Sequence, residues 1–142
     1  MFEVAGGSYV GVFGQVDPWD DQLDYAGEGV FLLNRSLRDS EIVDGAAQTL
    51  FVGERSARHM ASTWTGMHPD EEEGPERVIG FTIHAPNSPE ADEAEFSSRH
   101  PGGAHFLLGD GSVRLISNDV DRHVYQALGT RAGQELFDHP RF

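Results

Sequence analysis

The pair Asp110-Gly111, between two short runs of alternating apolar residues, constrains the fold more than any other feature of the chain. Asp-Gly in this setting is a strong signal for a β-hairpin, because both residues accept the positive φ of a type I′ turn. With a two-residue turn, the facing pairs would be Leu108 with Val113 and Phe106 with Leu115. These four side chains would share one face of the hairpin. The sequence therefore predicts a β-ribbon in the last third of the chain.

A short helix is predicted directly after this hairpin. Asn118 or Asp119 can cap its first turn, and Asp121 adds negative charge near the positive end of the helix dipole. An apolar stripe with a spacing of four follows, made of Val120, Val124 and Leu128. Gly129 then supplies a left-handed stop. Because the helix is short, packing against a sheet must stabilise it.

The rest of the chain favours short strands and turns over long helices. Apolar or β-branched segments predict further strands at Tyr9–Phe13, Gly29–Leu33, Thr49–Gly53 and Val78–Ile83. Acidic runs at about 69–76 and 89–95 are expected to be solvated loops. We therefore expect a single domain over residues 1–142, of the α+β class and mainly antiparallel β.

Composition excludes several kinds of partner and site. Ten basic residues against 24 acidic ones leave a formal charge of −14. Nucleic acids and anionic membrane surfaces reward Lys and Arg clusters, so neither is an expected partner. The absence of cysteine excludes disulfides and thiolate metal sites, and it fits an exported protein as well as a cytoplasmic one. No phosphate-binding loop, dinucleotide fingerprint or serine nucleophile elbow is present.

A family resemblance appears in three segments of the chain. His100, nine intervening residues and then Asp110-Gly111 form the first, which continues through Val124–Leu128 and Thr130–Gly133. The stretch Ile42–Arg55 and, more weakly, Ser8–Gly14 form the other two. In this order they resemble the bacterial prepilin-like family named for its His-x9-Asp-Gly motif. Its members resemble type IV pilins and type II secretion pseudopilins, and most have no known function.

The resemblance implies a pilin-like globular head, ending in the β-hairpin and short helix. Family members usually begin with a basic leader and a long apolar helix, whereas this sequence opens MFEVAGGSYVGVFG. It has no apolar stretch there near the 18 residues that a membrane helix needs. We therefore expect the globular part of such a protein without its anchor, or a divergent soluble relative. An apolar groove should be exposed where the helix would pack.

The motif residues themselves are expected to shape turns. Asp110-Gly111 and Asp44-Gly45 have the same turn chemistry, and His100 is expected to pack or hydrogen-bond locally. Ten extended residues span roughly 33 Å, so His100 could meet Asp110 only if Pro101-Gly102-Gly103 reverses the chain.

Calcium is the sharpest ligand hypothesis for this region. Asp110, Asn118, Asp119 and Asp121 offer the hard oxygen ligands that calcium prefers, as some pseudopilins do in a C-terminal loop. Helix capping explains the last three equally well, and no EF-hand loop is present. We therefore expect that no cofactor is required and that calcium is an optional ligand.

Other candidate sites have weaker support. The seven histidines lack His-Glu-x-x-His spacing and lie in different predicted elements, which favours dispersed surface histidines over a zinc site. Trp19 and Trp64 could form a carbohydrate platform, although aromatic residues of this kind are more often in the core.

The sequence thus predicts a structural or interaction protein, with no catalytic residues. The leading hypothesis is a pseudopilin-like or pilin-like head that contacts itself or other pilin-like subunits during envelope or extracellular filament assembly, or during secretion. This segment would make no membrane contact. The alternative is a secreted or surface-exposed module that binds carbohydrate or protein, with calcium as a stabilising ion.

Overall fold

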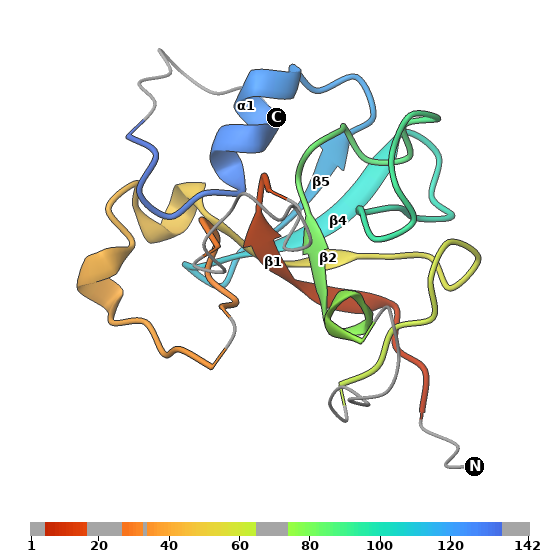
Figure 1. Cartoon of the computed structure of the whole chain (residues 1–142). Coiled ribbons are helices and arrows are strands. Elements are labelled where there is room, and N and C mark those ends of the chain that lie inside the picture. The colour runs from red at the N-terminus through yellow and green to blue at the C-terminus, as the bar shows by residue number, and fades with distance from the viewer. Residues whose placement is uncertain (1–4, 17–26, 33, 65–73, 135–142) are drawn as a thin grey trace.

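A computed structural model describes residues 5–16, 27–32, 34–64 and 74–134. Within them, strands β1 (Tyr9–Gly14), β2 (Leu50–Glu54), β3 (Ile79–Phe81), β4 (Gly103–Leu108) and β5 (Val113–Ser117) form one sheet of order β3-β1-β2-β4-β5 (Figure 1). The described α-helix is α1 (Arg122–Leu128), and 3-10 turns cover Asp39–Glu41, Ala46–Gln48 and Pro75–Arg77. Strand pairs are antiparallel except β1 with β3, which is parallel. The expected α+β class with a mainly antiparallel sheet is confirmed.

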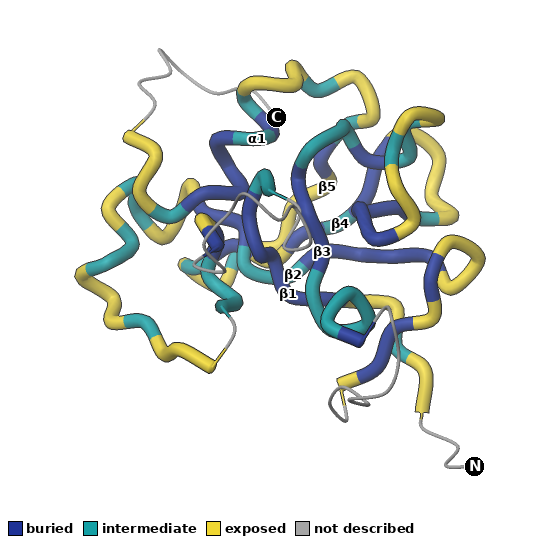
Figure 2. The backbone as a smooth tube through the Cα atoms, in the orientation of Figure 1, coloured by how far each residue is buried: buried dark blue, intermediate teal, exposed yellow. Residues whose placement is uncertain are grey.

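Helix α1 covers one face of this sheet. The main core lies between them and consists of Val10, Val12, Leu50, Phe96, Ala104, Phe106, Leu108, Ile116, Tyr125 and Leu128. Val120 and Val124 pack against it from the predicted helix stripe. Buried positions follow β1 to β4 and the side of α1 that faces the sheet, while exposed positions lie mostly in the connecting loops and along β5 (Figure 2). We call the sheet surface that faces away from α1 the outer face.

The hairpin forms as predicted, but the predicted register is wrong by one residue. Leu107 pairs with Val113 and Ala104 with Ile116, and the Leu108 N–H donates to the Ser112 carbonyl at 2.9 Å. The loop therefore has three residues, with only Gly111 in the left-handed region at φ +85°. Asp110 accounts for the difference, since its carboxylate accepts hydrogen bonds from the Ser112 N–H (2.9 Å) and hydroxyl (2.7 Å).

This register changes which side chains face the solvent. The inner face receives Ala104, Phe106, Leu108 and Ile116, all at most 1% exposed. The outer face receives His105, Leu107, Val113 and Leu115 instead. Phe106 and Leu108 therefore do not share a face with Val113 and Leu115, which corrects the predicted grouping.

Both predicted ends of α1 also need correction. Asp121 is the N-cap, and its carboxylate accepts the N–H groups of His123 (2.9 Å) and Val124 (3.1 Å). Neither Asn118 nor Asp119 caps the helix. Gly129 has φ −78°, so it is not a left-handed stop. A Cβ there would lie 2.0 Å from the Thr82 hydroxyl, so close packing explains this glycine.

Two predicted segments take a different form. Gly29–Leu33 is not a strand in its described part, 29–32. The N–H groups of Gly29 and Val30 donate instead to the carbonyls of Phe13 (2.7 Å) and Val12 (3.1 Å), near the C-terminal end of β1. The acidic run at 89–95 is not fully solvated either, because Ala94 and Glu95 are 0% and 2% exposed. Glu95 accepts hydrogen bonds from the His84 ring (2.9 Å) and the Asp92 N–H (3.0 Å), which compensate for its burial.

A fully buried arginine joins the end of β2 to its surroundings. Arg55 follows β2 directly and is 0% exposed. Its guanidinium donates to the Ser62 hydroxyl (3.1 Å), to the carbonyls of Ile79 (3.0 Å) and Ala94 (3.1 Å), and to the Glu76 carbonyl. Burial lowers the pKa of Arg55 to about 10, so it remains charged at neutral pH. Four segments are therefore tied to one cation.

Candidate functional site

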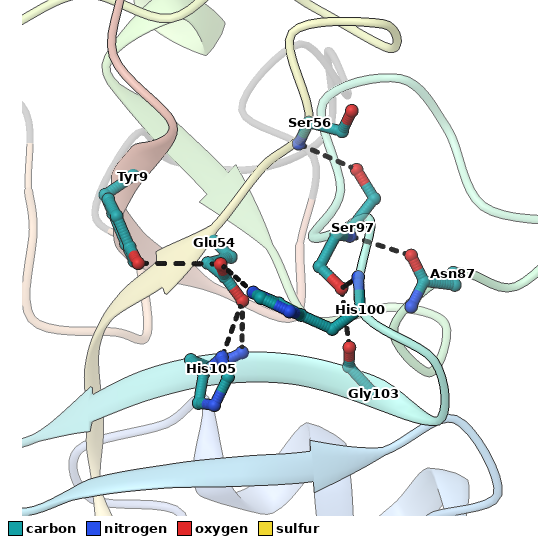
Figure 3. Close-up of polar contacts among 9 residues, drawn as sticks. Tyr9, Glu54, Ser56, Asn87, Ser97, His100, Gly103 and His105 are labelled. Atoms are coloured by element: carbon teal, nitrogen blue, oxygen red, sulfur yellow. Dashed lines mark hydrogen bonds and ion pairs between the residues drawn. The ribbon is translucent and has the colours of Figure 1, made fainter.

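One carboxylate and two imidazoles meet on the outer face (Figure 3). Glu54 Oε1 lies 3.0 Å from His100 Nε2, and Glu54 Oε2 lies 3.1 Å from His105 Nδ1. The His100 and His105 rings meet edge to face, with centroids 4.8 Å apart. We call these three residues the Glu-His-His cluster. Among the described residues, these three side chains are the set whose possible ligand atoms lie close enough together to share a metal ion.

The sheet register places two of these residues. Gly53 pairs with Phe106 on the inner side, so the next residues on the two strands, Glu54 on β2 and His105 on β4, point to the outer face. The His105 backbone N–H also donates to Glu54 Oε2 at 2.7 Å. The carboxylate is thereby fixed by main chain as well as by side chains.

His100 reaches the cluster from the turn that precedes β4. Ser98 organises this turn: its hydroxyl donates to the Gly103 carbonyl at 2.6 Å and accepts the His100 N–H at 3.0 Å. Gly102 closes the turn with φ +88°, a conformation that glycine adopts at low cost. The chain reversal at Pro101-Gly102-Gly103 thus directs the ring of His100 to Glu54.

The electrostatic environment keeps Glu54 ionised. Partial burial alone would raise its pKa, but hydrogen bonds from the His105 N–H and ring, together with the charge and hydrogen bond of His100, lower the pKa overall. The Tyr9 hydroxyl lies 3.5 Å from Glu54 Oε1. Its pKa is raised by partial burial and by the negative charge of Glu54, so it stays a neutral donor.

We expect Glu54 to make protein stability depend on acid pH. Since folding lowers its pKa, its contribution is complete above the unfolded glutamate pKa of about 4.3 and is lost as pH falls through the lower, folded value. Glu54→Gln should therefore lower the free energy of unfolding by about 1–3 kcal/mol at pH 6, and by less at pH 3. Urea titrations at the two pH values measure this. Glu90→Gln, at an exposed glutamate, serves as the control. An equal cost of Glu54→Gln at both pH values would contradict the predicted pH dependence.

An exposed apolar strip lies beside the cluster. Tyr9, Leu107, Val113 and Leu115 are 46%, 36%, 63% and 44% exposed. They stand on β1, β4 and β5 and share the outer face with His105. A groove of about 430 Å³ runs along the first three and is lined by Tyr9, His100, His105, Phe106, Leu107 and Val113. We call the four exposed residues the outer strip.

The structure separates the two ends of the His-x9-Asp-Gly motif. His100 and Asp110 lie at opposite ends of β4, a strand of six residues and thus about 20 Å long. His100 bonds to Glu54, whereas Asp110 bonds to Ser112 at the hairpin tip. These hydrogen bonds from Ser112 lower the pKa of Asp110. Asp110 thus has a local role at the hairpin tip. The expectation that His100 bonds locally holds for its backbone N–H, which donates to Ser98, and is wrong for its ring, which bonds to a residue 46 positions away.

The four predicted calcium ligands are not brought together. Asp110 lies at the start of β5, and the other three follow its end. The Asp121 carboxylate caps α1, and the Asn118 side-chain oxygen accepts a hydrogen bond from Asn87 at 2.8 Å. The Asp119 N–H donates to the Ser117 hydroxyl at 3.1 Å. Capping and turn contacts thus involve the carboxylates of Asp110 and Asp121 and the backbone of Asp119, while the Asn118 amide bonds to Asn87.

The Asp44-Gly45 turn is hydrogen-bonded to the segment that follows α1, at Gly133 and Gln134. Gly45 has φ +92°, and its N–H donates to the Ile42 carbonyl at 3.3 Å. The Asp44 carboxylate accepts the N–H groups of Gly133 and Gln134, each at 2.8 Å. Two segments that carry the family resemblance therefore contact each other here.

The predicted aromatic platform can be placed only in part. Trp19 lies outside the described residues. Trp64 is 53% exposed, and its ring lies 6.1 Å from the ring of Phe31 in an edge-to-face contact. Phe31 in turn covers Gly11 of β1. Trp64 is therefore an aromatic side chain at the surface that packs on Phe31 and lies outside the two buried core clusters.

Sequence reasoning missed Glu54 as a site residue. It is separated from His100 by 46 positions and from His105 by 51. No local spacing records such a contact, because it depends on the pairing of β2 with β4. The available signal was its place at the predicted end of a strand, followed by Arg55.

Comparison with known families gives one match. A family model described as a protein of unknown function (DUF1559) matches residues 4–123, which is most of the chain. The chain belongs to this family. The match includes the outer strip and the Glu-His-His cluster and ends within α1. No curated protein and no solved structure matches the chain. Among the described residues, no helix is both long and apolar enough to cross a bilayer.

Proposed function

We propose that this DUF1559 domain is a non-catalytic assembly domain, the head of a pilin-like or pseudopilin-like subunit that acts in envelope or extracellular filament assembly or in secretion. The observation that carries the proposal is the outer strip. Helix α1 packs on one face of the sheet, while the other face presents four large apolar side chains on β1, β4 and β5. Clustered apolar exposure of this kind marks interaction surfaces.

A second pilin-like subunit is the occupant that fits this strip. The chain carries a formal charge of −14, so two such domains repel at long range and need an apolar contact to associate. The four residues of the outer strip are uncharged, and three of them, Tyr9, Leu107 and Val113, line a groove that an apolar side chain could enter. β5 is also an edge strand of the sheet that the described residues form, and an edge strand can pair with a neighbour.

The resemblance to prepilin-like proteins supports the same conclusion. The motif residues serve structural roles. His100 links the turn before β4 to Glu54 at the end of β2, Asp110 shapes the hairpin tip, and Asp44 accepts a hydrogen bond from Gly133. A fold whose motif residues stabilise turns suits a scaffold. Its function would then depend on subunit contact.

Charge placed on the outer strip is expected to block self-association. Val113→Glu should weaken association of the purified domain by about tenfold or more, because the carboxylate would have to be desolvated in the contact. Sedimentation velocity over a concentration series measures the effect. Val43→Glu is the matched control, since Val43 is 55% exposed and lies outside the strip.

Two outcomes would contradict the proposal. One is equal weakening by Val43→Glu and Val113→Glu, which would indicate a general charge effect. The other is a wild-type domain that stays monomeric at every concentration tested. The second outcome would favour the alternative function, a surface binding module for carbohydrate or protein, which the exposed Trp64 supports.

A further inference from the structure

We propose that Glu54, His100 and His105 form a binding site for a divalent transition metal ion, and that the ion is zinc. Two imidazole nitrogens and one carboxylate oxygen are a donor set that proteins use for zinc when further positions are left to water or substrate. The three ligand atoms lie within 4.8 Å of one another. This inference depends on the cluster alone and is independent of the proposed assembly function.

The two carboxylate–imidazole distances are close to those around a tetrahedral ion, while the whole set of ligand atoms spans up to 4.8 Å and would have to contract. Zinc holds nitrogen and oxygen ligands at about 2.0–2.2 Å, which places neighbouring ligand atoms about 3.3 Å apart. The carboxylate lies 3.0 Å from His100 Nε2 and 3.1 Å from His105 Nδ1. Small movements of side chains that are 51% and 38% exposed would therefore open the space for an ion between the three groups.

Zinc binding is expected to depend on pH. Since an ionised Glu54 carboxylate only accepts hydrogen bonds, the ring nitrogen that faces it carries a proton in each of the two present contacts. Zinc would bind these two nitrogens in their deprotonated form, and the single proton of each neutral ring would move to the other nitrogen. A doubly protonated ring would have to release one proton to solvent, so affinity should fall as pH is lowered.

Groups around the cluster orient the carboxylate before any ion arrives. Glu54 is 11% exposed at its side chain and accepts the His105 N–H at 2.7 Å, while the Tyr9 hydroxyl lies at 3.5 Å. Such outer contacts fix the direction of a metal ligand and raise affinity. His100 and His105 also line the groove beside the outer strip, so a fourth ligand would reach the ion from there.

The donor set distinguishes zinc from calcium. Calcium takes six to eight oxygen ligands, whereas this cluster offers two nitrogens and one carboxylate. Imidazole ligands suit zinc, copper and nickel. The chain has a formal net charge of −14 and would attract any divalent cation weakly. A specific site must therefore be demonstrated by substituting the residues that form it.

The test is a zinc titration of the purified chain without a histidine tag. Isothermal titration calorimetry should give one saturable zinc site per chain, which excess calcium does not displace. His100→Gln and Glu54→Gln should each weaken zinc binding by more than the 10–100-fold that outer-contact changes cost. His123→Gln is the matched control, because this exposed histidine lies on α1, away from the cluster.

Histidine side-chain NMR spectra locate the ion independently of affinity. Zinc should shift the ring signals of His100 and His105 and leave those of His123 in place. Circular dichroism of each variant separates loss of the site from loss of the fold. Zinc binding that persists unchanged in the His100→Gln and Glu54→Gln variants, or the absence of any saturable site in a folded wild-type chain, would overturn the proposal.

Discussion

Replacing Arg55 with alanine is expected to lower the free energy of unfolding by about 4 kcal/mol, close to the upper end for single substitutions. The guanidinium is 0% exposed and donates to the Ser62 hydroxyl and to the carbonyls of Glu76, Ile79 and Ala94. Alanine would leave these buried acceptors without partners and would leave a cavity at the end of β2. Urea denaturation followed by circular dichroism measures the loss.

Two further variants make this expectation specific. Arg55→Lys keeps the positive charge but replaces the planar fork with a single ammonium, so it should recover less than half of the loss. Arg58→Ala removes an exposed arginine three residues along the chain and should change stability by about 0.5 kcal/mol or less. If Arg55→Ala were no more destabilising than Arg58→Ala, the buried network would not hold the fold together as described.

Replacing Gly53 with alanine is expected to cost about 3 kcal/mol, although it adds only one methyl group. A Cβ at this position of β2 would lie 2.4 Å from the Phe106 ring and 2.5 Å from the Phe96 ring. These two rings are 1% exposed and pack edge to face with centroids 5.0 Å apart, so neither can move into solvent. The β2 and β4 strands, or the rings, must shift instead.

A double mutant tests the cause. Phe96→Leu alone should be destabilising because it leaves a cavity, but it should relieve part of the crowding when combined with Gly53→Ala. The combined cost measured by urea denaturation should then be smaller than the sum of the two. Gly6→Ala is the matched control, since a Cβ there has its nearest neighbour at 3.9 Å. Additive costs in the double mutant would contradict the steric explanation.

These two residues show what local patterns leave open. Arg55 follows a predicted strand in a sequence position typical of an exposed charge, yet it is buried among segments that lie 7 to 39 residues away. Gly53 weakens a strand by propensity alone, yet the core needs it because two phenylalanines meet above it. Both roles arise only when distant segments are packed together.

The hairpin illustrates the limit of a strong local signal. The Asp-Gly pair correctly indicated a turn between Leu107 and Val113, but it is compatible with loops of two or three residues. The side-chain contacts of Asp110 with Ser112 select the longer loop. A change of one residue in register then reverses which side chains face solvent, and so creates the outer strip.

Periodicity and turn chemistry in the sequence by themselves located β1 to β5, the hairpin turn and the apolar stripe of α1, because these features depend on neighbours within a few residues. They did not determine the hairpin register, and they also predicted a strand at Gly29–Leu33 that the described part, 29–32, does not form. Only the tertiary structure decided the strand order, with β3 parallel to β1, and the meeting of Glu54 with His100 and His105. Such contacts join positions about fifty residues apart through backbone hydrogen bonds between strands. Those bonds are alike for every residue type, so they leave no periodic trace in the chain.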